Sequence, residues 1–178
     1  EAADALLDTA PDRARQRVHN ALERTRASLA EARRSVLALR AGPLERYELH
    51  EALAQLAQQF QADTGIEVVQ ALEAVPASNS TEALYRIAQE ALANTRRHAE
   101  ARHVSLRLER RANEYVLIVE DDGKGFDLAA QPGNGSSSQS FGLTSMRERA
   151  HQVHGTLLVR SAPGAGTRVE ARIPASGA

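Results

Sequence analysis

The segment VEDDGKGF, residues 119–126, decides how this chain is interpreted, because an apolar strand runs here into Asp121, Asp122 and a Gly-x-Gly turn. Glycines let the backbone approach a ligand closely and adopt positive φ. A carboxylate at a strand end can accept a hydrogen bond from the exocyclic amine of adenine, whereas guanine presents a carbonyl oxygen there. The segment therefore indicates an adenine-selective pocket. A plain Asp-Gly β-turn between strands is the alternative.

Upstream, the segment EALANTRRH, residues 90–98, reads as part of a helix. Glu90, Asn94 and Arg97 fall at positions i, i+4 and i+7 and so share one polar stripe. Such a stripe can hold a hydrated Mg²⁺ and the phosphates that it bridges, because Mg²⁺ keeps several waters and takes few protein oxygens. An ordinary solvated helix face is the alternative.

Downstream, residues 128–140 are rich in Gly, Ser and Gln and are expected to form a loop of functional length. A helix is predicted from Gly142 to about Val153. The free backbone N–H groups and the dipole of a helix starting at Gly142 would make an anion site, here for phosphates. A surface loop followed by a capped helix is the alternative. Further on, Thr167 places a hydroxyl at the start of a strand.

Hydrophobic periodicity predicts the remaining elements. A helix is expected to end near Gly65, and Ser80 or Thr81 is expected to cap the helix that carries the polar stripe. Strands are predicted at residues 66–72, 104–108, 116–119, 156–160 and 167–173. This order predicts an α/β two-layer sandwich, in which helices cover one face of a mixed, mostly antiparallel sheet.

The first 42 residues differ from the rest and end at Gly42-Pro43. Their apolar positions recur in alternating steps of four and three, at Val18, Leu22, Thr25, Leu29, Ala32, Val36 and Leu39. This spacing is typical of a coiled-coil or bundle seam, and a long helix with so narrow a seam needs a partner in water. Two domains are therefore expected, residues 1–42 and residues 43–178.

The composition is that of an ordinary globular domain, with 42% hydrophobic and 25% charged residues. The 22 basic and 23 acidic residues give no net field, so nucleic acid is not an expected partner. Without cysteine, disulfides and thiolate metal sites are excluded. No apolar run approaches the ~20 residues that span a bilayer, and no membrane contact by this chain is expected.

In this order the segments resemble the ATP-binding domain shared by sensor histidine kinases, gyrase B, the ninety-kilodalton heat-shock ATPases and MutL. EALANTRRH resembles the asparagine box, DDGKGF the first glycine box, GLTSMRER the second, and GAGTRVEARIP the closing strand. The resemblance implies ATP and Mg²⁺ as ligands, with Asn94 as the metal ligand. The other residues that it implies at the nucleotide are Arg97 and His98 by the phosphates, Asp121 at the adenine amine, Gly123, Gly125 and Thr167 around the pocket, and Phe141, Gly142 and Leu143 beside the lid.

GLTSMRERA and LAEARRSVLALR narrow the resemblance to the nitrate-sensor and desaturase-sensor type of histidine kinase. In that type two dimerisation helices precede the ATP-binding domain. Residues 11–40 are expected to be the second helix and residues 1–7 the tail of the first. The phosphoacceptor histidine belongs on the first helix, before an acidic residue. Since His19 lies on the second helix and precedes Asn20, the acceptor is expected to be absent.

The resemblance implies that the intact protein is a histidine kinase. It would transfer the γ-phosphoryl group of ATP to a histidine and then to an aspartate in the receiver domain of a response regulator. We expect this chain to be its ATP-binding fragment, cytoplasmic or from the cytoplasmic part of a membrane-anchored sensor, and a homodimer through the N-terminal helices when intact. Glu90 is the candidate to orient a water or an attacking group. A nucleotide-gated interaction module without phosphotransfer is the alternative, whereas an ATPase of the MutL or gyrase type fits poorly.

Overall fold

The computed structural model describes residues 43–128 and 138–175. The chain divides into two units between Gly42 and Pro43. The predicted dimerisation helices and His19 lie outside the described residues, as does most of the predicted lid, and these assignments stay predictions. No helix in the described part of the chain is long and apolar enough to cross a membrane.

The described part contains one five-stranded sheet with the strand order β1-β2-β3-β5-β4. Strand β1 runs parallel to β2, and the other three pairs are antiparallel, so the predicted mixed, mostly antiparallel sheet is confirmed. The strands are β1 (Glu67–Leu72), β2 (His103–Arg111), β3 (Glu114–Asp121), β4 (Thr156–Ser161) and β5 (Thr167–Pro174). The C-terminal end of β3 pairs with the start of β5, which places Asp121 opposite Thr167.

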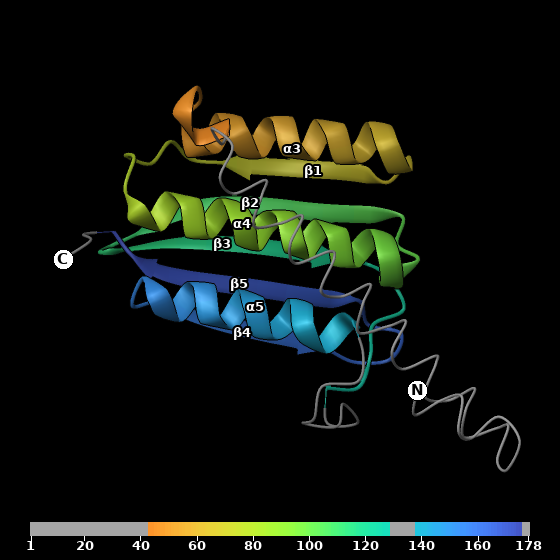
Figure 1. Ribbon diagram of the computed structural model, residues 1–178. Helices are drawn as coiled ribbons and strands as arrows, with labels where there is room; N and C mark the ends of the chain where they lie inside the picture. The colour runs from red at the N-terminus through yellow and green to blue at the C-terminus, as the bar shows by residue number, and fades with distance from the viewer. Residues whose placement is uncertain (1–42, 129–137, 176–178) are drawn as a thin grey trace, which may run out of the picture. The chain divides into compact units, whose positions relative to one another are not determined.

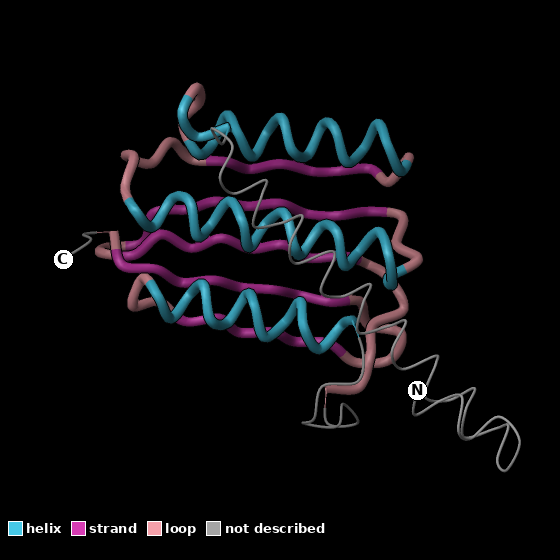
Figure 2. Tube along the Cα trace, viewed as in Figure 1, coloured by secondary structure: helices cyan, strands magenta, loops and turns pink. Residues whose placement is uncertain are grey.

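Three α-helices lie side by side over one face of this sheet, which confirms the two-layer sandwich (Figure 1, Figure 2). They are α3 (Leu49–Thr64), α4 (Asn79–Asn94) and α5 (Ser138–Gln152). A short 3₁₀ turn, η1 (Pro43–Glu45), precedes α3. A π-helical turn, η2 (Thr95–Ala99), continues α4 directly.

The core lies between the helices and the sheet, because alternate residues of β3 point toward α4. Leu117 of β3 and Ile87 of α4 are at most 1% exposed. Burying a side chain of this size stabilises the fold by roughly 1.5–3 kcal/mol. The central helix α4 is therefore fixed against the central strand, and the two elements carry Asn94 and Asp121, two of the polar residues that were predicted to bind a ligand.

The boundary predicted for α3 is confirmed, but the cap predicted for α4 is wrong. Gly65 ends α3 with a φ of 72°, the left-handed conformation that glycine adopts easily. Helix α4 begins after Ser78, rather than after Ser80 or Thr81. Both hydroxyls are buried within the first turn, where Thr81 donates to the Ser78 carbonyl (2.6 Å) and Ser80 to the Pro174 carbonyl (3.2 Å).

The predicted start of the last helix is also wrong. Helix α5 begins at Ser138, so Gly142 lies inside it and the predicted loop ends before Ser140. The unpaired N–H groups of a helix are those of its first four residues. The N–H of Gly142 is therefore not one of the free donors, and its predicted part in an anion site has no support. Serine in the first turn is compatible with a helix start, and the polarity of the stretch concealed this turn.

Candidate functional site

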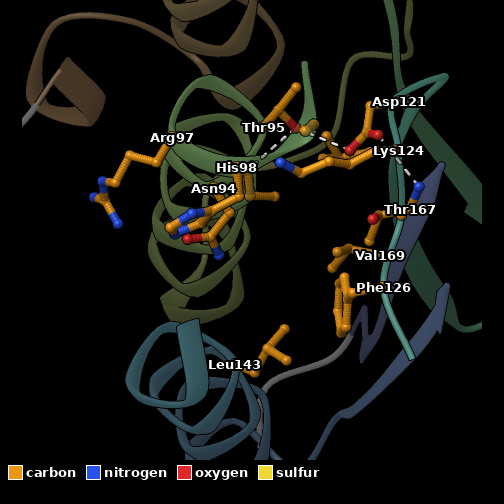
Figure 3. A pocket seen from close by; sticks show the side chains of 14 residues that line it. Asn94, Thr95, Arg97, His98, Asp121, Lys124, Phe126, Leu143, Thr167 and Val169 are labelled. Atoms are coloured by element: carbon orange, nitrogen blue, oxygen red, sulfur yellow. Dashed lines mark hydrogen bonds between the residues drawn. The ribbon is translucent and has the colours of Figure 1, made fainter. Parts of the chain in front are cut away.

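A cavity of about 250 Å³ opens where α4 and η2 face the end of β3 and the start of β5. Figure 3 shows Asn94 and His98 along its helical wall and Asp121, Thr167, Val169 and Phe126 along the opposite wall. Leu143 of α5 closes a third side. The residues that line it are Ala91, Asn94, Thr95, Arg97, His98, Ala99, Val119, Asp121, Lys124, Gly125, Phe126, Leu143, Thr167 and Val169.

Asp121 is 8% exposed and accepts three hydrogen bonds from three segments. Its Oδ1 accepts the backbone N–H of Gly123 (3.0 Å) and that of Thr167 (3.3 Å), and its Oδ2 accepts the hydroxyl of Thr95 (3.2 Å). Burial raises the pKa of the Asp121 carboxyl, while these hydrogen bonds act in the opposite direction. A buried acceptor is thus held in a fixed orientation at this wall of the cavity.

The two glycines of the turn after Asp121 are required by close packing. A Cβ atom on Gly123 would collide with the carbonyl oxygen of Ala99, and one on Gly125 with the carbonyl oxygen of Ala162. Gly125 also has a φ of 57°. The turn therefore lies directly against η2 on one side and the β4–β5 hairpin on the other, which is the close approach expected of a Gly-x-Gly segment.

Thr95 reaches Asp121 through the π-helical turn, a feature that the sequence did not predict. Thr95 directly follows Asn94 and is only 4% exposed. Its hydroxyl, however, contacts both the Ala91 carbonyl (3.3 Å) and Asp121. Single π-helical turns occur often at functional sites. The only available signal was a hydroxyl residue next to Asn94 in sequence.

The helical wall, across the cavity from Asp121, carries buried polar atoms that have no hydrogen-bond partner. Within the described residues, neither Oδ1 of Asn94 nor Nε2 of His98 makes a hydrogen bond. A buried unsatisfied polar atom costs about 1–3 kcal/mol, so such atoms call for an explanation such as a ligand or water. This end of the cavity is therefore chemically incomplete without a bound group.

Three charged side chains act on the His98 ring: those of Arg97, Lys124 and Glu90. Burial lowers the pKa of the His98 imidazole, and the positive charges of Arg97 and Lys124 lower this pKa further, against the opposing effect of Glu90. The ring is therefore neutral at neutral pH. Nη1 of Arg97 lies 3.8 Å from Oε1 of Glu90, and Figure 3 shows the Arg97 side chain extending away from the cavity. Nζ of Lys124 pairs with Glu100 at 2.6 Å.

The sequence model of the histidine kinase-, DNA gyrase B- and HSP90-like ATPase family matches residues 79–177. The chain belongs to this family. It is 34% identical over 171 residues to the signal transduction histidine-protein kinase/phosphatase DegS of Brevibacillus brevis, covering 94% of this chain and 43% of that protein. It is 35% identical over 148 residues to the sensor protein VraS of Staphylococcus saprophyticus, covering 83% of this chain and 41% of that protein.

Among solved structures, the fold is similar to the histidine kinase domain of a blue-light activated histidine kinase from Erythrobacter litoralis. The TM-score is 0.61 at 24% identity, over 71% of this chain and 61% of that one. The predicted ATP-binding domain of a sensor histidine kinase is thus confirmed at the level of the family. Since the chain spans less than half of these curated relatives, the activity of a whole kinase stays a proposal.

The structure of this ATPase-family domain brings most of the predicted site residues together. The predicted residues that line the cavity are Asn94, Arg97, His98, Asp121, Gly125, Leu143 and Thr167. Gly123 belongs to the turn but packs against Ala99 of η2, and Glu90 lies outside the lining beside Arg97. Phe141 belongs to α5, but its side chain lies outside the described part. The lining residues that the sequence did not single out include Thr95, Lys124 and Phe126.

The residues of this family member fit a metal with few protein ligands. Among the described residues, no group of three His, Cys, Asp or Glu side chains could hold a metal ion. Mg²⁺ typically takes one or two protein oxygens and keeps its waters, and the unpartnered Oδ1 of Asn94 is an oxygen of the right kind. Which residues contact nucleotide and metal stays a prediction.

Proposed function

We propose that this chain is the ATP-binding catalytic part of a two-component sensor histidine kinase, acting with Mg²⁺. The observation that carries the proposal is one cavity with a buried, oriented carboxylate on one wall and unpartnered polar atoms on the other. The family match and the sensor kinases among its relatives support it. In this proposal the first wall, around Asp121, binds the base, and the second wall, around Asn94, faces the phosphates.

At the base wall, Asp121 accepts the exocyclic amine of adenine. Oδ2 of Asp121 receives a single hydrogen bond in the structure, from Thr95, and a carboxylate oxygen can accept a second. Guanine would place a carbonyl oxygen against this carboxylate, and two acceptors repel each other. Apolar contacts from Val119, Val169 and Phe126 suit the faces of a purine ring.

At the phosphate wall, Asn94 would hold Mg²⁺ through its Oδ1. Mg²⁺ held there would supply positive charge against the negative charge that develops during phosphoryl transfer. The neutral His98 ring can donate or accept a hydrogen bond there without adding charge. Arg97 and Lys124, which pair with Glu90 and Glu100 in the structure, carry positive charge near this wall. Glu90 pairs with Arg97 and acts first by positioning this guanidinium, rather than as a free base.

The complete reaction needs parts beyond the described residues. In the intact protein, the γ-phosphoryl group would pass to a histidine on a dimerisation helix and then to an aspartate in the receiver domain of a response regulator. The nucleotide-binding part contributes positioning and charge stabilisation, which supply most of the catalysis in phosphoryl transfer. Homodimerisation and a cytoplasmic location belong to the same proposal.

Nucleotide binding tests the first half of the proposal. Calorimetric titration of the 178-residue chain with ATP and with GTP should show a preference for ATP that tightens when Mg²⁺ is present. Equal affinities for ATP and GTP would remove the adenine assignment of Asp121. An ATP affinity that does not change with Mg²⁺ would contradict the assignment of a metal to this site.

Phosphoryl transfer tests the second half. Incubated with γ-labelled ATP, this chain alone should bind nucleotide without labelling itself, and an added polypeptide that carries the acceptor helix should become labelled. Acid-labile, base-stable label on His19 of this chain would overturn the fragment assignment. Binding that never leads to label on any acceptor helix would favour a nucleotide-gated interaction module instead.

A further inference from the structure

Ser161, the last residue of β4, has a hydroxyl that joins two segments of the cavity wall, the turn at Phe126 and the start of β5 at Gly166 and Thr167. Its Oγ lies 2.8 Å from the carbonyl oxygen of Gly166, 2.9 Å from the backbone nitrogen of Phe126 and 3.1 Å from Oγ1 of Thr167. Phe126 and Thr167 line the cavity, whereas Ser161 does not. Ser161 therefore stands directly behind the wall that holds Asp121.

The chemistry of these partners fixes where each hydrogen lies. The carbonyl of Gly166 can only accept, so the single hydroxyl hydrogen of Ser161 must point to it. The two lone pairs of Ser161 are then available to the N–H of Phe126 and the O–H of Thr167. The hydroxyl hydrogen of Thr167 is thereby committed to Ser161, and Thr167 offers only lone pairs to any other partner.

This commitment affects the base wall as a whole. The backbone N–H of Thr167 is also used, because it donates to Oδ1 of Asp121. Oδ1 and Oδ2 of Asp121 can only accept while the carboxyl is ionised. Thr167 and Asp121, which lie opposite each other in the β3–β5 register, therefore present acceptors without a free donor.

We propose that Ser161 is a specificity-determining residue that acts through Thr167. By holding the hydroxyl hydrogen of Thr167, it keeps the base wall all-acceptor, which matches the amine of adenine and opposes the carbonyl oxygen of guanine. This inference rests on the proposed nucleotide function, since it refines how the same site selects its base. The role of Ser161 is positioning, because its own hydroxyl does not face the ligand.

The decisive variant is Ser161→Ala in the 178-residue chain. Without the serine oxygen, the Thr167 hydroxyl can rotate and donate to a carbonyl oxygen in the cavity. ATP affinity should fall while GTP affinity falls less or rises. The ratio of the two dissociation constants should drop roughly three- to tenfold, the size expected of one neutral hydrogen bond.

Three further variants separate specificity from simple loss of structure. Ser161→Thr keeps the hydroxyl and should keep the ratio. Thr167→Val removes the donor and acceptor together, so Ser161→Ala should no longer change the ratio in that background. Ser105→Ala is the matched control, because Ser105 alternates with the core residues Val104 and Leu106 and so lies on the other face of the sheet.

The outcomes distinguish the inference from the proposed function. A parent chain that binds ATP and GTP equally would defeat the adenine site and this inference with it. A parent that prefers ATP, with Ser161→Ala weakening both nucleotides by the same factor, would overturn only the inference. If thermal unfolding shows that Ser161→Ala does not fold, Thr167→Val decides: an unchanged ratio in that variant overturns the role assigned to the Thr167 hydroxyl.

Discussion

The two walls of the cavity differ in how many of their buried polar atoms are already hydrogen-bonded within the protein. At the base wall, both carboxylate oxygens of Asp121 already accept hydrogen bonds from backbone and side-chain donors. At the phosphate wall, Oδ1 of Asn94 and Nε2 of His98 are buried without partners in the described part of the chain. The carboxylate at one wall is held by partners within the protein, and the other wall leaves two polar atoms for a ligand or water.

This difference indicates that the two walls contribute to different aspects of nucleotide binding. A preorganised acceptor discriminates among bases at no further ordering cost, which suits recognition. Unsatisfied buried atoms cost about 1–3 kcal/mol each, and a ligand that satisfies them recovers this energy on binding. We therefore expect base selectivity to depend on the Asp121 wall and the metal-dependent part of the affinity to depend on the Asn94 wall.

The largest expected effect comes from Asp121→Asn. The amide keeps the shape of the side chain, and its oxygen can stay on the two backbone donors of Oδ1. The NH₂ group then replaces Oδ2 and opposes the adenine amine. ATP affinity should fall by ~1–3 kcal/mol, while the free energy of unfolding holds or rises because a buried charge is removed. Calorimetry and urea denaturation measure the two quantities.

The neighbouring carboxylate provides the control. Asp122 is exposed and accepts the backbone N–H of His103, which, with the His103 side chain, lowers the Asp122 pKa to about 2. Asp122→Asn should lower stability and leave the ratio of ATP to GTP affinity unchanged. If Asp121→Asn and Asp122→Asn shift this ratio by the same factor, the selectivity does not reside in Asp121.

Acidification should reproduce the loss seen in Asp121→Asn. Burial raises the pKa of Asp121, so its carboxyl gains a proton at a higher pH than an ordinary aspartate and ceases to be a pure acceptor. The folded state binds this proton more tightly than the unfolded chain does. Asp121 thus contributes stability below its unfolded pKa, which is lost as the pH rises through the folded pKa. The contribution of Asp122 to stability depends on pH in the opposite sense, since it is lost as the pH falls toward about 2.

Titrations across the acid range should therefore show ATP affinity declining as the pH falls, more steeply in the parent than in Asp121→Asn. Comparing the two proteins removes the titration of ATP itself. Parallel pH profiles would show that Asp121 does not control this decline.

At the other wall, Asn94→Ala should leave the fold intact and remove the Mg²⁺-dependent gain in ATP affinity, roughly tenfold for a single charge-assisted contact. The substitution also removes an unsatisfied buried oxygen, so stability should change little. Asn94→Asp restores an oxygen ligand and is the matched control, in which the Mg²⁺ dependence should persist. Binding of Asn94→Ala that still tightens with Mg²⁺ as in the parent would place the metal elsewhere.

Sequence patterns predicted the fold well, because alternating strands and apolar helical faces reflect one large core. All five strands and the Gly65 stop of α3 were found, although β2 and β3 extend up to three residues beyond the predicted ranges. The starts of α4 and α5 were missed, since serine is compatible with both a loop and a first turn. Which serine begins a helix depends on packing that a local pattern does not contain.

The site was only partly predictable, for a related reason. Asn94, Asp121 and Thr167 were identifiable because each stands at a recognisable place in an element or motif. The partners that orient them were not, since Thr95 reaches Asp121 through a π-helical turn and Ser161 reaches Thr167 across a hairpin. Contacts between residues distant in sequence leave no periodic signal.

The smallest expected effect links the phosphate wall to α5. A Cβ atom at Gly142 would lie 2.6 Å from Oε1 of Glu90 and 3.1 Å from Nδ2 of Asn94. The same Oε1 is the atom that faces Arg97. Gly142→Ala should therefore displace the Glu90 carboxylate, loosen Arg97 and crowd Asn94.

Two measurements should move in opposite directions in Gly142→Ala. Alanine is favoured over glycine in a helix interior by ~1 kcal/mol, so the free energy of unfolding should hold or rise. ATP affinity should nevertheless fall by roughly two- to fivefold, as for loss of a weak, partly exposed ion pair. Glu90→Ala makes room for the new methyl group, so adding Gly142→Ala to it should cost little further affinity. Thr144→Ala, at an exposed position of the same helix, is the matched control and should leave ATP affinity unchanged. If Gly142→Ala lowers ATP affinity by the same factor in the parent and in the Glu90→Ala background, the effect of α5 on the phosphate wall does not act through this carboxylate.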